Sequence, residues 1–286
     1  MVNLLNTRPS PIAGQWYPSD GEVLAERVDN YMDAARLPNI DGDIIAVMAP
    51  HAGHEFSGPV AGYAFAALRG KTPDLVIVVS PMHYPYFEPL LTTAHSEYAT
   101  PLGTLTVDHD ALNTLDTFLL AKLGFGLTRV GHDSEHSLEI ELPFLQRVLG
   151  NPFQLVPIMV RDQSVRVARS LGEAIASLMT CDEKRDCQSA LLVASTDLSH
   201  FYPQEVARKL DAEVLRQVEE FNPAGVIQVE EEGKGYACGR GALAAVLFAA
   251  QGLGADHAQI LHYATSGEIT GDYSRVVGYA AAVITQ

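Results

Sequence analysis

Residues 190–200 read ALLVASTDLSH, an apolar run that ends in a cluster of polar side chains. The same pattern recurs in IIAVMAPHAGH at residues 44–54 and in LVIVVSPMH at residues 75–83. A fourth apolar run, at residues 155–160, contains Pro157, which cannot donate a ladder hydrogen bond. Short and nearly continuous apolar runs predict β-strands that are buried on both faces of a sheet.

Helical periodicity lies outside these runs. It is found in a stripe from Val23 to Met32 and around Val60–Leu68, Ala111–Leu123, Leu138–Leu149, Val165–Met179, Val206–Glu219 and Ala242–Ala250. Strands that alternate with helices predict an α/β fold with a mostly parallel central sheet and helices on both faces. The run Val276–Ile284 adds a last strand. Because no repeat or Gly/Ser-rich linker interrupts the chain, we expect a single domain over residues 1–286.

The composition excludes several classes of protein. Of the 286 residues, 47% are apolar and 19% are charged, which is too apolar for a disordered chain. The 35 acidic residues outnumber the 19 basic ones and give a net charge of −16, so no nucleic-acid partner is expected. Three cysteines, Cys181, Cys187 and Cys238, are too few for a disulfide framework and favour a reducing compartment.

Neither a secretion signal nor a membrane span is evident in the sequence. Residues 1–11 lack the basic segment and the apolar stretch of a signal peptide. The most apolar run, residues 241–250, is shorter than the roughly 18 residues that suggest a span. We therefore expect a soluble cytoplasmic protein with no membrane partner.

Histidines follow three of the predicted strands. His51, His83 and His200 each come two to six residues after a strand, and ligands of open α/β sheets gather beyond the carboxyl ends of the strands. One histidine alone is more often a turn or capping residue, but three at one edge indicate a metal site, which needs imidazoles from separate elements. His54 is a weaker candidate for the same cleft.

A second polar cluster contains Glu135 and His136 and precedes the helical pattern that starts near Leu138. We expect its acidic and hydroxyl side chains to cap that helix, and we count Glu135 and His136 as possible cleft residues. Cys238 precedes the last helical pattern. The helix dipole and the nearby Arg240 would favour its thiolate, a good soft ligand, although an ordinary buried cysteine is equally consistent with the local sequence.

Other chemistries have less support. The sequence contains no phosphate-binding loop, no dinucleotide fingerprint, no H-E-x-x-H motif and no G-x-S-x-G elbow. A hydrolase that uses Cys238 and His200 without a metal remains conceivable, but it would leave His51 and His83 without a role.

Several segments, in order along nearly the whole chain, resemble the MEMO family, whose prokaryotic members are called AmmeMemoRadiSam system protein B. They are Arg8-Pro9, GQWYP at 14–18, PHAGHEFSG at 50–58, EHSLE at 135–139, LPFL at 142–145, STDLSH at 195–200, Cys238-Gly239 and VVGY at 276–279. The sequence departs from the family at His54, where Tyr is frequent, and at Met82, where Ser or Thr commonly precedes the histidine.

The resemblance implies a fold similar to that of class III extradiol ring-cleaving dioxygenases, whose non-haem iron is held by two histidines and a carboxylate. Carried over by motif, His51, His83 and Cys238 would bind the metal, with cysteine in the place of the carboxylate. His200 would be the acid/base, with Asp197 beside it. Fe(II), Cu and Zn all suit such a ligand set, with Fe(II) or Cu expected first.

Two functions follow as hypotheses. The first is a metal-dependent redox enzyme in which His200 transfers a proton and Asp197 orients His200 or a substrate hydroxyl. The second is a non-catalytic module that binds a peptide or a partner protein in the same cleft. The resemblance suggests a radical S-adenosylmethionine protein and an AMMECR-type protein as the partners.

Overall fold

The predicted strands form the centre of one large sheet. The computed structural model describes residues 5–180 and 189–286, so Cys181 and Cys187 lie outside the described residues. The central strands are parallel and follow one another in the order β2 (Ile44–Ala49), β9 (Ala190–Ser195), β3 (Leu75–Pro81) and β8 (Gln154–Val160). Pro157 does not interrupt β8, where it pairs with Val78. The apolar runs thus form the buried parallel strands that they predict.

Antiparallel strands extend this parallel centre on both sides. They make the sheet mixed, whereas the sequence predicted a mostly parallel one. On one side lie β12 (Val276–Thr285), β11 (His257–Thr265) and the short β10 (His200–Tyr202). On the other side lie β4 (Leu90–Thr93) and β7 (Thr128–Val130). A connection as short as residues 266–275 cannot cross over the sheet, so β11 and β12 pair as an antiparallel hairpin.

A separate small sheet was not predicted. It consists of β1 (Leu5–Arg8), β5 (His95–Thr100) and β6 (Gly103–Thr106). Its strands are short and partly exposed, so they lack the continuous apolar pattern that marks the central strands.

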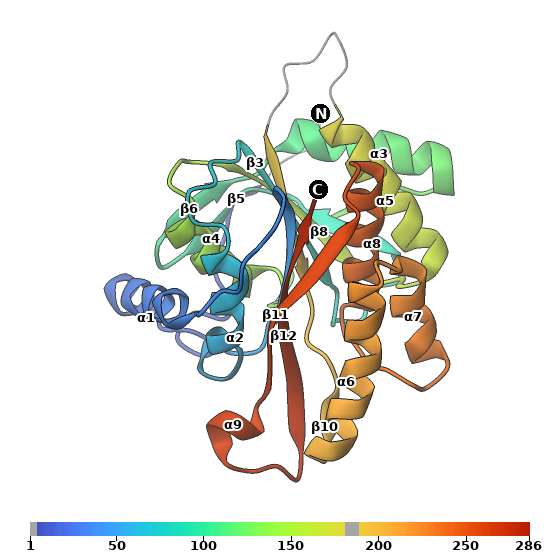
Figure 1. The fold of residues 1–286 in the computed structure, drawn as a ribbon. Coiled ribbons are helices and arrows are strands. Elements are labelled where there is room, and N and C mark those ends of the chain that lie inside the picture. The colour runs from blue at the N-terminus through green and yellow to red at the C-terminus, as the bar shows by residue number, and fades with distance from the viewer. Residues whose placement is uncertain (1–4, 181–188) are drawn as a thin grey trace.

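Helices cover both faces of the large sheet (Figure 1). Their bounds are α1 (Gly21–Ala34), α2 (His54–Ala66), α3 (His109–Leu123), α4 (Leu142–Val148), α5 (Val165–Met179), α6 (Gln204–Glu219), α7 (Pro223–Glu231), α8 (Arg240–Gly252) and α9 (Gly267–Thr270), with the 3₁₀ turn η1 (Glu139–Glu141). Helix α2 packs on β2, β11 and β12, and α1 and α4 pack on α2. Helix α8 packs on β2, β3 and β9 from the other face, and α5 and α7 pack on α8.

Several helices differ from the sequence predictions. Helix α2 begins at His54, before the predicted start at Val60, and Pro59 in its second turn does not end the helix. The helix predicted from Leu138 begins only at Leu142, after η1, and no side chain caps it. Helix α7 was missed because its apolar pattern is short.

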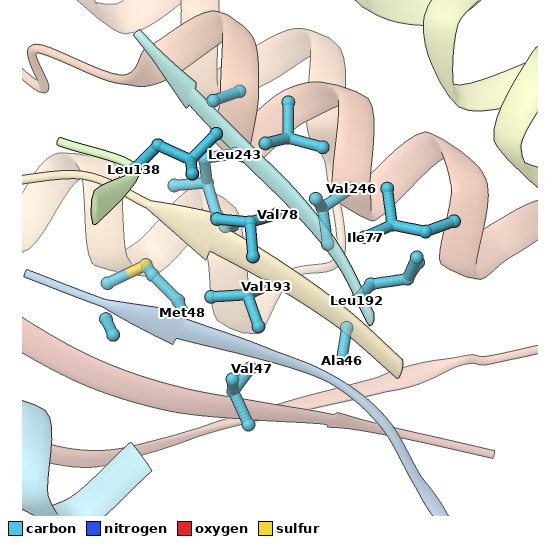
Figure 2. Close-up of a cluster of buried hydrophobic side chains, with 14 of the residues drawn as sticks. Ala46, Val47, Met48, Ile77, Val78, Leu138, Leu192, Val193, Leu243 and Val246 are labelled. Carbon is cyan, nitrogen blue, oxygen red and sulfur yellow. The ribbon is translucent and has the colours of Figure 1, made fainter. Parts of the chain in front are cut away.

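One connected hydrophobic core joins these layers and runs from Ile12 to Ile284. Figure 2 shows its centre, where Leu243 and Val246 of α8 meet side chains of β2, β3 and β9. Each large apolar side chain buried in this way contributes roughly 1.5–3 kcal/mol. The continuity of the core agrees with a single-domain α/β fold. Within residues 5–180 and 189–286, no helix is long and apolar enough to cross a membrane.

Candidate metal centre

Three histidines come together at the carboxyl edge of the sheet. His51 follows β2 and His83 follows β3, while His136 comes from the irregular segment before η1. One ring nitrogen from each of the three lies within 4.8 Å of those of the other two, so the group could hold a metal ion. The parallel strands bring His51 and His83 to one place, as the sequence suggested. His136, which was counted only as a cleft residue, completes the group.

The hydrogen bonds of His51 determine its tautomer. Its ring is buried, and Nδ1 lies 2.9 Å from the hydroxyl oxygen of Ser195. That hydroxyl donates its only hydrogen to the Ser137 carbonyl at 2.6 Å, so it must accept a hydrogen from Nδ1 of His51. Nε2 therefore keeps its lone pair. Burial, followed by the neighbouring His83, His136 and His200, lowers the pKa of His51 well below its ordinary value, which keeps the ring neutral.

His83 is held in the same tautomer by a carboxylate. The Glu135 carboxylate accepts hydrogen bonds from the backbone N–H and from Nδ1 of His83, at 2.6 and 2.9 Å. The second bond leaves Nε2 of His83 free to bind a metal. Burial raises the pKa of Glu135, but the hydrogen bond from His83, the charges of His83 and His136 and the Ser137 N–H lower it to about 2. Glu135 is therefore a carboxylate at neutral pH.

His136 lies between Glu135 and the N-terminal segment. Its ring stacks near that of His83, with centroids 4.7 Å apart, and the Trp16 ring lies 4.1 Å away on a tilted plane. Burial, with a smaller effect of His83, lowers the pKa of His136 to about 4 although Glu135 opposes the shift. The buried Arg8 holds the whole segment, since Nη2 donates to the Glu135 carbonyl at 2.8 Å.

Cys238 lies against this group. Its Sγ is 3.1 Å from Nε2 of His51 and accepts a hydrogen bond from the backbone N–H of Asp197 at 3.3 Å. The expectation that the helix terminus and Arg240 lower its pKa is wrong. Burial, followed by the Asp197 charge, raises the pKa of Cys238 well above its ordinary value. Arg240 instead bonds to Glu230, which also accepts from the Ala237 N–H.

Asp197 binds backbone near the centre. Its Oδ1 accepts a hydrogen bond from the His51 N–H at 2.7 Å, and its carbonyl oxygen accepts one from the Cys238 N–H at 3.2 Å. Burial raises the pKa of Asp197 to about 7, against the N–H groups of His51 and Ala52, which lower it. Asp197 thus ties together the two segments that carry His51 and Cys238.

His200 begins β10, and its charge is among the causes that lower the pKa of His51. Nδ1 donates to the Leu198 carbonyl at 2.8 Å, which leaves Nε2 as the acceptor. Burial lowers the pKa of His200, with a further contribution from His83.

His54 is buried away from the three-histidine group. Its ring packs between those of Tyr17 and Phe144, and Nε2 bonds to the Ile140 carbonyl at 3.0 Å. Sequence reasoning gave no role to Ser195 or Trp16. A serine that ends an apolar strand between two histidine-bearing neighbours was the available signal for Ser195, while the position of Trp16 depends on tertiary contacts alone.

The residues present fit a metal ion. The rings of His51 and His83 each have Nδ1 engaged in a hydrogen bond, so that Nε2 is the atom left to bind a metal, as is usual for metal-binding histidines. The 3.1 Å between Sγ of Cys238 and Nε2 of His51 is close to the roughly 3.5 Å that separates sulfur and nitrogen ligands of one tetrahedral ion.

Comparison with known proteins identifies the family. The model of Memo-like proteins matches residues 8–283 of the chain. A MEMO1 family protein of Methanopyrus kandleri is 37% identical over 287 residues, covering 96% of this chain and 98% of the relative. MEMO1 family proteins of Nitrosopumilus maritimus and Methanosarcina acetivorans are 32% and 33% identical, covering 96% and 98% of this chain and 98% and 100% of the relatives. On this evidence the chain belongs to the family of Memo-like proteins.

Proposed function

We propose that this protein is a metal-dependent redox enzyme in which His51, His83 and Cys238 hold a divalent metal. The observation that carries the proposal is the pair of imidazoles of His51 and His83, whose Nδ1 atoms are held by Ser195 and Glu135, with Nε2 of His51 3.1 Å from Sγ of Cys238. Fe(II), Cu and Zn all suit such ligands, with Fe(II) or Cu expected first, and the bound ion would supply a Lewis acid and, for Fe or Cu, a one-electron redox centre.

The third ligand has two candidates. Cys238 is supported by its distance to His51, and His136 by its place within the three-histidine group. A thiolate and a third imidazole both suit Fe, Cu and Zn, and the thiolate is the softer ligand. We favour Cys238, since Nδ1 of His136 lies 3.4 Å from Glu135 and no described hydrogen bond holds that ring in one tautomer.

The remaining side chains give the site its acid/base function. His200 has an unprotonated Nε2, so it can take a proton from a substrate hydroxyl and return it later. Asp197 holds the backbone of His51 and Cys238 in place and is buried beside them. Trp16 shields one side of His136 from water.

Metal loading tests the proposal. Protein loaded anaerobically with Fe(II), Cu or Zn and freed of unbound ions should retain about one metal per chain. His51→Gln and His83→Gln should lose it, and the control His257→Gln, which changes an exposed histidine, should retain it. Trp16 is the only tryptophan, so quenching of its fluorescence by Cu would report binding beside His136. Wild-type protein that retains no metal would refute the proposal.

A thiolate ligand has its own signature. Cu(II) or Co(II) bound through Cys238 should give a sulfur-to-metal charge-transfer band that Cys238→Ser lacks, while His136→Gln keeps it. A band-free spectrum for the wild type, with binding lost in His136→Gln, would assign the third position to His136.

One observation favours the alternative function of partner binding. Large apolar side chains are exposed on the segments that follow His83 and His200, among them Tyr84, Phe87, Phe201 and Tyr202, and Phe87 is fully exposed. Exposed aromatic residues are common in protein interfaces. Co-purification with the radical S-adenosylmethionine or AMMECR-type protein, unaffected in His51→Ala and lost in Phe87→Ser, would support this function.

A further inference from the structure

A buried carboxylate outside the metal centre holds the segment that carries His200. Asp211 lies in α6 and is fully buried. Its Oδ1 accepts a hydrogen bond from the backbone N–H of Ser199 at 2.8 Å, and its Oδ2 accepts one from the Tyr263 hydroxyl at 2.7 Å. Both donors are neutral groups. Burial raises the pKa of Asp211, and the bonds from Tyr263 and Ser199 oppose that rise.

Strand β12 packs against the same carboxylate at Gly278. A Cβ atom at Gly278 would come within 2.0 Å of Oδ2 of Asp211, so only glycine leaves room for it. Gly278 also bonds the His200 segment twice, since its carbonyl accepts from the Leu198 N–H and its N–H donates to the Ser199 carbonyl, both at 2.9 Å. Residues 198 and 199 are therefore held between α6 and β12.

The imidazole of His200 depends on this anchored backbone. Its Nδ1 donates to the carbonyl of Leu198, whose backbone is bonded to Gly278. The backbone N–H of Ser199, between Leu198 and His200, donates to Asp211. Phe201, directly after His200, has a φ of 63°, a left-handed conformation that is costly for a bulky side chain. Such strain persists only where the surrounding structure imposes it, and it is concentrated at functional sites.

Stability alone does not explain a carboxylate at this position. Replacing a buried charged group by a well-packed apolar side chain is often neutral or stabilising. An apolar residue at position 211 would spare the desolvation of a carboxylate, but it would leave the Ser199 N–H without its acceptor. What the carboxylate specifically provides is two acceptor atoms that join α6, β11 and the His200 segment at one point.

We propose that Asp211 is a positioning residue for His200, which it holds, together with Tyr263 and Gly278, in the Nδ1–H tautomer with Nε2 directed for proton transfer. This inference rests on the acid/base role of His200 in the proposed function. Asp211 itself touches neither the three histidines nor Cys238 in the described contacts.

Nuclear magnetic resonance of the imidazole nitrogens tests the proposal. The His200 signals would be assigned by comparison with His200→Gln. In wild-type protein the Nδ1–H tautomer should dominate, and in Asp211→Ala its ratio to the Nε2–H tautomer should fall by about tenfold or more. Asp211→Asn keeps one oxygen acceptor for the Ser199 N–H and should restore much of the wild-type ratio. A folded Asp211→Ala protein with the wild-type ratio would overturn the proposal.

Tyr263→Phe keeps the test decisive if Asp211→Ala does not fold. This variant removes one hydroxyl and leaves the carboxylate in place, so we expect an intermediate tautomer ratio, and an unchanged ratio would overturn the proposal. Metal content per chain should stay within about twofold of wild type in each folded variant. Failure of the wild type to bind metal would refute the proposed function, whereas the tautomer ratio would still decide the role of Asp211.

Discussion

The segment 135–141 carries a buried glutamate at each end, and the two carboxyl groups are held in opposite states. Glu135 accepts hydrogen bonds from the N–H groups of His83, His136 and Ser137 and from the His83 ring. Neither oxygen of Glu141 has a hydrogen-bond partner in the described part of the chain. The donors lower the pKa of Glu135 to about 2 despite burial, whereas burial raises the pKa of Glu141 well above its ordinary value.

Because both glutamates are buried, the opposite shifts of their pKa values come from the N–H donors that Glu135 has and Glu141 lacks among the described residues. Both glutamates are at most 1% exposed, so desolvation opposes ionisation in each. Glu135 is an anion at neutral pH and lies beside His83 and His136, which suits a site for a cation. The charge of Asp197 adds to the rise in the pKa of Glu141, and the hydroxyl of Ser195 opposes it.

The largest expected effect comes from removing the charge of Glu135. Glu135→Gln replaces one carboxylate oxygen by an amide nitrogen, which donates hydrogen bonds and cannot accept them. Depending on which oxygen is replaced, either the backbone N–H of His83 or those of His136 and Ser137 lose their acceptor. We expect a loss of about 3 kcal/mol in the free energy of unfolding and a 10- to 100-fold loss of metal affinity. Urea unfolding and metal titration measure the two.

Glu219→Gln, at the exposed end of α6, is the matched control and should change neither quantity measurably. If Glu135→Gln left metal affinity unchanged, Glu135 would not orient His83.

Acid should reveal Glu135 in the unmodified protein. The pKa of Glu135 is depressed in the folded state, from an ordinary value of 4.5 to about 2. Its contribution to the free energy of unfolding is therefore complete above pH 4.5 and is lost as the pH falls toward 2. One pKa unit corresponds to about 1.36 kcal/mol, so the full shift of this one group corresponds to a loss of about 3 kcal/mol in the free energy of unfolding. Unfolding free energies of wild type and Glu135→Gln, measured from pH 6 to pH 3, should therefore converge. Parallel curves would contradict this assignment.

The residues at the carboxyl edge of the sheet are predicted well, because each directly follows its strand in the sequence. An apolar run followed by a histidine marks each of β2 and β3, and parallel pairing then brings His51 and His83 together. The position of His136 was not predictable in this way. Its segment is irregular and is placed by Arg8, which bonds to the Glu135 carbonyl from 127 residues away along the chain.

The protonation states escape the sequence for the same reason. Nothing near Cys238 in the chain indicates that burial beside Asp197 would outweigh the helix dipole and raise the pKa of its thiol. Glu135 and Glu141 are equivalent in a polar-apolar sequence pattern. Only the three-dimensional placement of N–H donors makes their pKa values shift in opposite directions.

Glu141 should give the opposite pH dependence. Because its pKa is raised in the folded state, its contribution to stability is complete below the unfolded value and is lost as the pH rises through the folded value. Glu141→Gln cannot ionise. The unfolding free energy of the variant minus that of wild type should thus increase by about 1.4 kcal/mol for each pH unit above 5 over which folded Glu141 keeps its proton. A difference that is constant from pH 5 to pH 8 would show that Glu141 is ionised in the fold.

The smallest effect should come from Ser195, which does for His51 what Glu135 does for His83. Ser195→Ala removes a neutral acceptor of Nδ1 of His51, whereas Glu135 is charged and accepts from several groups. We expect a loss of about 1 kcal/mol in stability and of at most about tenfold in metal affinity, with Ser19→Ala, an exposed serine, as the control. If Ser195→Ala weakened metal binding as much as Glu135→Gln, the orientation of the ring, and not the charge of its acceptor, would limit affinity. A neutral hydroxyl and a carboxylate would then be equivalent acceptors as far as metal affinity is concerned. The difference between Ser195 and Glu135 would affect stability alone.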